Sequence, residues 1–168
     1  MKRLVLSLLV ENNPGVLSRV SGLFSRRGYS IDSFTCGKTT EKNLARMTVV
    51  AHGDENILEQ IEKQLSKLVE VVEIFTLSPD SSVYRELALI KVEANEKTRG
   101  SIVSIADIFR ARIIDVAPES LIIEATGDQG KLDGLLAMLE GFNIIEIVRT
   151  GLCGMGRGQS NLNINEIE

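Results

Sequence analysis

Apolar residues in the first half of the chain follow two spacings, one typical of buried strands and one typical of amphipathic helices. Residues 4–10 are apolar except for Ser7, which predicts a strand buried on both faces. Val16, Val20 and Phe24 then recur at helical spacing, and Gly28 is placed to end that helix. The pattern predicts a strand at 4–10, a helix at 16–27, strands at 29–38 and 45–51, a helix at 57–68 and a strand at 71–77.

The second half repeats this order after a polar segment at 78–82, which is rich in serine and contains a proline. An offset of 74 residues takes Gly53 and Asp54, ahead of the second helix, onto Gly127 and Asp128. The repeated elements are predicted as strands at 87–92, 112–117, 121–126 and 144–150 and helices at 102–109 and 132–139.

Each half therefore has the order βαββαβ, which is the plan of the split-βαβ or ferredoxin-like fold. We expect an α+β protein with two consecutive ferredoxin-like βαββαβ domains. The first is predicted at 1–78 and the second at 84–160, with a linker at 79–83 and a tail at 161–168.

Composition and charge narrow the range of partners. The chain has 168 residues, with 19 Lys and Arg against 23 Asp and Glu, and only 4% of its residues are aromatic. No segment concentrates basic residues enough to follow a phosphate backbone, so we expect no nucleic-acid partner. The apolar run at 4–10 is too short for a membrane span and lacks the cleavage site of a signal peptide. We therefore expect no membrane partner and a cytoplasmic protein, with Cys36 and Cys153 as free thiols.

The turn after the first strand is the best candidate for a binding site. Asn13 is a suitable N-cap, Pro14 fits the first helical position, and Gly15 leaves the backbone open to another molecule. The backbone N–H groups of Gly15, Val16 and Leu17 would then lack helical partners and could receive a small carboxylate. The same residues would also serve an ordinary strand-to-helix turn that binds nothing.

Other candidate chemistry is weak. His52 is the only histidine and has no metal-ligating neighbours at suitable spacing, and Cys36 has no basic residue placed to lower its pKa. The glycine-rich segment 151–158 lacks the Lys-Ser/Thr ending of a phosphate-binding loop, and we expect a flexible tail there. Because no nucleophile, base and orienting group come together, we expect a chain that is not an enzyme and binds no metal.

The sequence also resembles known families. Pro14-Gly15-Val16-Leu17 at the first turn of a βαββαβ unit resembles the ACT domain, a small regulatory module that binds amino acids. A longer set of residues resembles the small regulatory subunit of acetolactate synthase. Those residues are Glu11 to Gly15, Leu17-Ser18-Arg19-Val20, Gly22-Leu23-Phe24, Arg27-Gly28-Tyr29, Arg46-Met47-Thr48, 58–65, 108–110, 113–116 and 130–133.

This resemblance implies a function in the biosynthesis of branched-chain amino acids. It implies a homodimer whose N-terminal ACT domains bind valine at their interface. It also implies a separate catalytic subunit that carries thiamine diphosphate, Mg²⁺ and FAD. Association with this chain would make that subunit more active and sensitive to valine. This chain would hold no cofactor itself. By resemblance the ligand-facing residues are Asn12, Gly15, Val16 and Leu17 of one chain, completed by Ser30 and Ile31 of the other chain of the dimer.

At one position this chain departs from its family, and at another its second half departs from its first. The family usually has asparagine where this chain has Ser30, and a hydroxyl reaches less far than an amide. The second repeat has no Pro-Gly helix start, so we expect that half to contact the catalytic subunit instead of binding the same ligand. A stand-alone amino-acid sensor with another partner is the main alternative, and a small ferredoxin-like enzyme is a weaker one.

Overall fold

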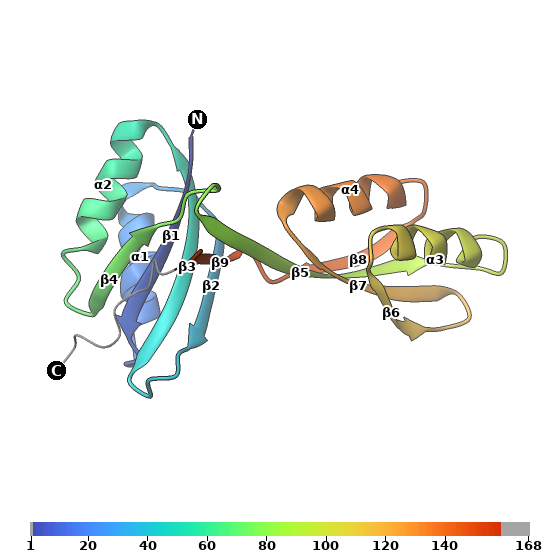
Figure 1. Ribbon diagram of the computed structural model, residues 1–168, viewed down its shortest axis with the longest axis horizontal. Coiled ribbons are helices and arrows are strands. Elements are labelled where there is room, and N and C mark those ends of the chain that lie inside the picture. Colours follow the sequence, from blue (N-terminus) through green and yellow to red (C-terminus); the bar gives the residue numbers. More distant parts are fainter. Residues whose placement is uncertain (1, 159–168) are drawn as a thin grey trace. The chain divides into compact units, whose positions relative to one another are not determined.

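Two antiparallel sheets, each with its own pair of helices, make up the computed structural model, which describes residues 2–158 (Figure 1). The strand order is β2-β3-β1-β4 in the first sheet and β6-β7-β5-β8 in the second. The same order in both sheets confirms the prediction of an α+β protein with two ferredoxin-like βαββαβ units.

The first unit has its helices on one face of its sheet. Its elements are β1 (Lys2–Glu11), α1 (Val16–Arg27), β2 (Ile31–Lys38), β3 (Leu44–Gly53), α2 (Glu55–Leu65) and β4 (Val71–Thr76). Residues 4–10 of β1 are all buried, as the apolar run predicted. Alternate residues of β1, among them Leu6 and Leu8, pack against Val20 and Phe24 of α1 and Ile61 of α2 to form the core.

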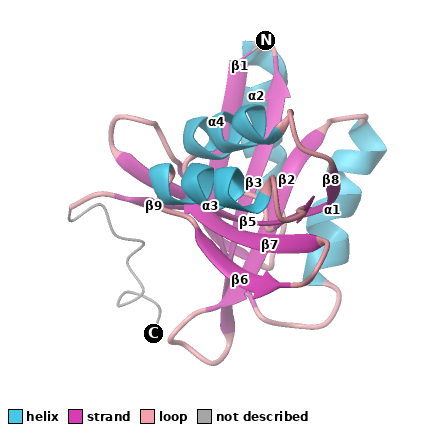
Figure 2. Ribbon diagram, turned by 90° about the vertical axis from the view of Figure 1, so that its right-hand side faces the viewer, coloured by secondary structure: helices cyan, strands magenta, loops and turns pink. Residues whose placement is uncertain are grey.

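The second unit repeats this arrangement, and Figure 2 shows both of its helices on one side of its strands. Its elements are β5 (Ser82–Glu93), α3 (Arg99–Ile108), β6 (Arg112–Val116), β7 (Ser120–Gly127), α4 (Gln129–Leu139) and β8 (Ile144–Arg149). Glu86 on β5 is buried and accepts two hydrogen bonds from Arg149 on β8, at 2.7 and 2.8 Å. This pairing raises the pKa of Arg149.

Matching helix caps show that the two units are structural repeats. The Asp54 carboxylate accepts from the backbone N–H of Ile57 at 2.9 Å, and the Asp128 carboxylate accepts from that of Lys131 at the same distance. Both aspartates have nearly identical backbone angles, with φ and ψ of −76° and 170° for Asp54 and −77° and 172° for Asp128. Asp54 and Asp128, which the 74-residue offset aligns in the sequence, therefore also occupy equivalent positions in the structure.

The glycine-rich segment forms a strand, so the prediction of a flexible tail at 151–158 is wrong. Strand β9 (Cys153–Gly156) pairs with β5, and residues 152–158 belong to the first unit. Side-chain hydroxyls on the outer face of the first sheet, away from the helices, bind its backbone. Ser33 accepts from the N–H of Leu152, and Thr48 accepts from that of Gly154.

The structure divides the chain differently from the predicted boundaries. The change of unit falls between Val83 and Tyr84, within β5, so Ser82 and Val83 of the predicted linker are part of a strand. The predicted tail at 161–168 lies outside the described residues. No helix in the described range 2–158 is long and apolar enough to cross a bilayer.

Candidate functional site

The turn between β1 and α1 has a different cap from the one predicted. Gly15, not Asn13, precedes the first helical residue, and it has a left-handed backbone with φ of 88°. The side chain of Asn13 instead donates to the Glu11 carboxylate at 2.7 Å, while its carbonyl accepts from the Val16 N–H at 3.3 Å. Glycine adopts the left-handed conformation without steric penalty, so Gly15 can take the cap position and the helix begins at Val16.

This helix start is open to a ligand. No side chain caps α1, and within the described part of the chain no acceptor faces the backbone N–H groups of Leu17 and Ser18. A Cβ atom built on Gly15 would meet none of the described residues within 4 Å, so the chain leaves room beside this glycine. Unpaired N–H groups at a helix amino end attract anions, and a small carboxylate can approach these two.

The matching turn in the second unit is built differently, without a left-handed glycine ahead of its helix. The Asn95 side-chain oxygen accepts from the backbone N–H groups of Lys97 and Thr98, at 2.9 and 3.1 Å. The Arg99 guanidinium donates to the carbonyls of Ala117 and Pro118, at 2.9 and 2.7 Å. The two repeats therefore share a fold but differ in the turn that leads into their first helix.

The side chains around the open turn have distinct environments. Leu17 is 51% exposed and stands beside the open N–H groups, whereas Val16 is 4% exposed and packs in the core of its own unit. The Val16 side chain is therefore not available to a ligand, and its backbone N–H, predicted to be free, is taken by the Asn13 carbonyl. Asn12 is exposed, and its backbone N–H donates to the Asn43 carbonyl at 2.7 Å, which fixes the end of β1.

Ser30 and Ile31 lie far from this turn within one chain. Ile31 pairs with Ala51, which also pairs with Leu4, whereas Glu11 lies at the other end of β1. Seven residues of strand separate Leu4 from Glu11, or about 23 Å at the usual rise per residue. One chain therefore does not bring all six predicted site residues together.

The other candidate residues do not form a reactive site. His52 lies against Asp32 through its Nδ1 atom, and burial raises the pKa of the Cys36 thiol, which makes it a weaker nucleophile. Among residues 2–158 there is no group of three or more His, Cys, Asp and Glu side chains that could hold a metal ion. The sequence did not single out Arg46 as a site residue, although it is a lone arginine inside an apolar strand, and in the structure it lines a pocket beside Ser7.

Comparisons with known proteins agree with this architecture. A family model described as an acetohydroxyacid synthase (AHAS) small subunit-like ACT domain matches residues 6–73, and one described as the small subunit of acetolactate synthase matches residues 85–158. The "Acetolactate synthase small subunit" of Mycolicibacterium smegmatis is 52% identical over 153 residues, 91% of this chain and 90% of that protein. The chain belongs to the acetolactate synthase small-subunit family.

Other members of the family match along nearly the whole chain. The "Probable acetolactate synthase small subunit" of Methanothermobacter thermautotrophicus is 46% identical over 159 residues, 94% of this chain and 95% of that protein. The crystal structure of the small subunit from Thermotoga maritima superposes with a TM-score of 0.86 at 41% identity, covering 94% of this chain and 99% of that one. The resemblance identified in the sequence is confirmed.

Proposed function

We propose that this small subunit regulates acetolactate synthase by binding valine between two copies of itself. In this proposal it is not an enzyme itself. It assembles with a catalytic subunit that carries thiamine diphosphate, Mg²⁺ and FAD, and it raises the activity of that subunit. Valine bound to the regulatory dimer then lowers the activity again. Membership in the small-subunit family supports the assembly, and the geometry of the first unit supports the place of the valine.

The observation that carries the valine site is the open helix start at Gly15. The backbone N–H groups of Leu17 and Ser18 would bind the valine carboxylate, and the left-handed glycine leaves room for it. The corresponding turn of the second unit has no left-handed glycine, and Asn95 organises its backbone instead, so the proposal places one site in each chain.

The edge strand β2 supports a shared site. It is one of the two outer strands of its sheet, and its outer edge, which no described strand pairs with, can pair with the same strand of a second chain. Lys38 and Val10 both pair with Ala45, so β2 ends at the same end of the sheet as the Gly15 turn. Antiparallel pairing of two β2 strands would bring Ser30 and Ile31 of one chain toward the turn of the other.

Side chains from both chains would complete this pocket. Leu17 of one chain and Ile31 of the other would flank the isopropyl group of valine, and Val16 would support the turn from the core. Asn12 and Ser30 would serve the amino group, with Ser30 acting through a bridging water where its hydroxyl is too short. Since the pocket needs two chains, valine binding would strengthen the dimer by linkage.

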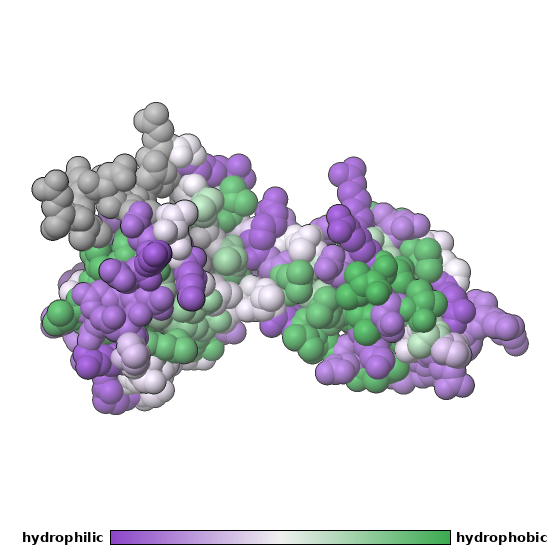
Figure 3. All heavy atoms as spheres, turned by 90° about the horizontal axis from the view of Figure 1, so that it is seen from below, coloured by the Kyte–Doolittle hydropathy of each residue, from purple (hydrophilic) through white to green (hydrophobic). Residues whose placement is uncertain are grey.

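The second unit offers a surface for the catalytic subunit. Figure 3 shows apolar side chains gathered on the side of this unit that faces the viewer. Leu89 and Val148 lie opposite each other on β5 and β8, on the sheet face away from the helices, and Val148 is 52% exposed. Exposed apolar areas of this kind are typical of protein-binding surfaces.

Reconstitution of the enzyme tests this function. The rate of acetolactate formation is measured with the purified catalytic subunit alone, with this chain added, and with valine or phenylalanine added to the mixture. We expect activation by the chain and inhibition by valine, with little effect of phenylalanine because the proposed pocket is lined by short aliphatic side chains. A catalytic subunit whose rate does not change when the chain is added would overturn the proposal and favour a sensor with another partner.

A further inference from the structure

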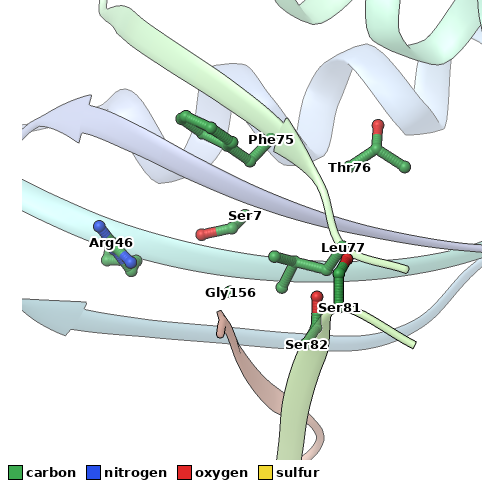
Figure 4. Close-up of a pocket in the computed structure, with 8 residues that line it drawn as sticks. All are labelled: Ser7, Arg46, Phe75, Thr76, Leu77, Ser81, Ser82 and Gly156. Carbon is green, nitrogen blue, oxygen red and sulfur yellow. The ribbon is translucent and has the colours of Figure 1, made fainter. Parts of the chain in front are cut away.

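A second pocket lies on the outer face of the first sheet, opposite α1 and α2. It lies beside β1, β3 and β4 and next to β9 and the segment that leads into β5 (Figure 4). Its lining residues are Ser7, Arg46, Phe75, Thr76, Leu77, Ser81, Ser82 and Gly156. All of them belong to the first unit, and none is part of the proposed valine site.

Ser7 presents an unsatisfied hydroxyl to this pocket. The residue is 1% exposed, and its Oγ atom has no hydrogen-bond partner among the described residues. Its neighbour across the strands on the same face, Thr48, is satisfied by the N–H of Gly154. An unsatisfied buried hydroxyl destabilises a fold by about 1–3 kcal/mol, so a group that accepts from Ser7 would stabilise this face.

Arg46 places a positive charge beside this hydroxyl. It lies opposite Leu9, one step along the same face from Ser7, and in Figure 4 the Ser7 hydroxyl points to the side on which Arg46 lies. The guanidinium of Arg46 makes no hydrogen bond or ion pair with any described residue, unlike that of Arg149, which is held by Glu86. Burial lowers the pKa of Arg46, and the negative charge of Glu73 only partly offsets this effect.

The size and walls of the pocket limit the ligand. The cavity measures about 70 Å³, which accommodates on the order of five heavy atoms, since one water needs about 10–15 Å³ on this measure. Phe75 and Leu77 give it an apolar wall next to the polar residues. The planar guanidinium fork matches a carboxylate better than a spherical ion, and the apolar wall suits a short carbon chain.

We propose that this pocket binds a small monocarboxylate, with its head group on Arg46 and Ser7 and its short aliphatic tail against Phe75 and Leu77. Because Gly156 of β9 also lines the pocket, the bound acid lies between the sheet and β9 and holds them together. The ligand is a second class of effector, and its site is separate from the turn proposed for valine.

The direct test follows the melting temperature and the backbone amide NMR signals of the full chain during titration with sodium propionate. Sodium acetate, sodium phosphate and sodium chloride at equal ionic strength serve as comparison titrations. We expect saturable shifts of the Ser7 and Gly156 amide signals and a higher melting temperature with propionate, a smaller effect with acetate, and no saturation with chloride. Phosphate acting as well as propionate would show that any oxyanion suffices, and that result would overturn the assignment to a carboxylate.

Variants locate the effect at Arg46. Arg46→Gln removes a charge-assisted contact and should weaken propionate binding by about tenfold or more. Arg46→Lys keeps the charge but loses the fork and should bind with intermediate strength. Arg26→Gln, which removes an exposed arginine on the helix side of the sheet, is the matched control and should bind like the wild type.

Ser7→Ala separates binding from stability. Removing an unsatisfied hydroxyl should leave the free protein as stable as the wild type or more stable, while propionate binding weakens. Equal binding by the wild type, Arg46→Gln and Ser7→Ala would overturn the proposal, and so would the absence of saturable shifts in the wild type. A Gly15→Asp variant should keep the propionate response, so a failure of the valine site would not be mistaken for a failure of this one.

Discussion

Gly15 and Val16 are adjacent in the chain, yet they play different parts in the proposed valine site. Gly15 has an open left-handed backbone with empty space in front of it, and Val16 is buried in the core of its unit. Helical periodicity placed Val16 on the apolar face of α1, which is where it lies. Its predicted contact with the ligand was carried over from the family resemblance, whereas in the structure its side chain is buried and its N–H donates to Asn13.

Ser30 gives a prediction at this scale. Ser30→Asn should tighten valine binding by about threefold to tenfold, because the longer amide reaches the ligand amino group directly. Ser30→Ala should weaken binding, since it removes the hydroxyl that holds the bridging water. Titration calorimetry with valine measures both changes. Because Ser30 is exposed, the melting temperatures without valine should stay close to the wild type, and three equal affinities would remove Ser30 from the site.

Most elements follow from the sequence because their signals are local. The apolar run of β1, the helical spacing in α1 and the aspartate caps of α2 and α4 each lie within a few residues of one another. The cap of α1 was mispredicted because two neighbouring residues compete for that role. Asn13 has a capping side chain, but Glu11 engages it, and the left-handed Gly15 takes the cap position.

Strand β9 did not follow from the sequence because its partners are distant. Glycine has a low strand propensity, and the segment 151–158 shows no alternation of apolar and polar residues. The strand is held by hydroxyls of Ser33, Thr35 and Thr48, more than a hundred residues earlier in the chain. Hydrogen bonds between residues so far apart in the sequence cannot be read from a local pattern of residue types.

The pocket at Arg46 was missed for the same reason, because Gly156, which is also distant in the sequence, completes its lining.

The attachment of β9 can be tested with one pair of variants. Leu152 is 3% exposed on the outer face of the first sheet, so Leu152→Ala should destabilise the first unit by about 2 kcal/mol, at the low end for a buried leucine. Met155 is 60% exposed, and Met155→Ala should change stability by less than about 0.5 kcal/mol.

Native-state hydrogen exchange of the β1 amides measures this effect without a contribution from the second unit. Equal protection in both variants would mean that β9 does not stabilise the sheet that it covers. A larger loss in Met155→Ala than in Leu152→Ala would place the wrong side chain in contact with the sheet.

For the molecule as a whole, two repeats of one fold have different tasks in our account. The first unit has a left-handed glycine at its helix start and a sheet edge at β2 that no described strand pairs with, while the second has a turn organised by Asn95 and exposes an apolar sheet face. Ser30 and Ile31 lie at the far end of the sheet from the turn of their own chain. A valine site that needs all these residues therefore needs two chains, and this requirement would link ligand binding to assembly.

The most direct test of this account compares Gly15→Asp with Gly15→Asn in the reconstituted enzyme. Both residues tolerate the left-handed backbone better than other side chains, and they are nearly equal in size, so they differ mainly in charge. The aspartate carboxylate would repel the carboxylate of valine by about 4 kcal/mol at 4 Å in a partly buried site. The measured quantity is the rate of acetolactate formation as the valine concentration rises. We predict that both variants activate the catalytic subunit, that Gly15→Asn stays valine-sensitive and that Gly15→Asp loses inhibition. A Gly15→Asp enzyme as sensitive to valine as the wild type would contradict the account.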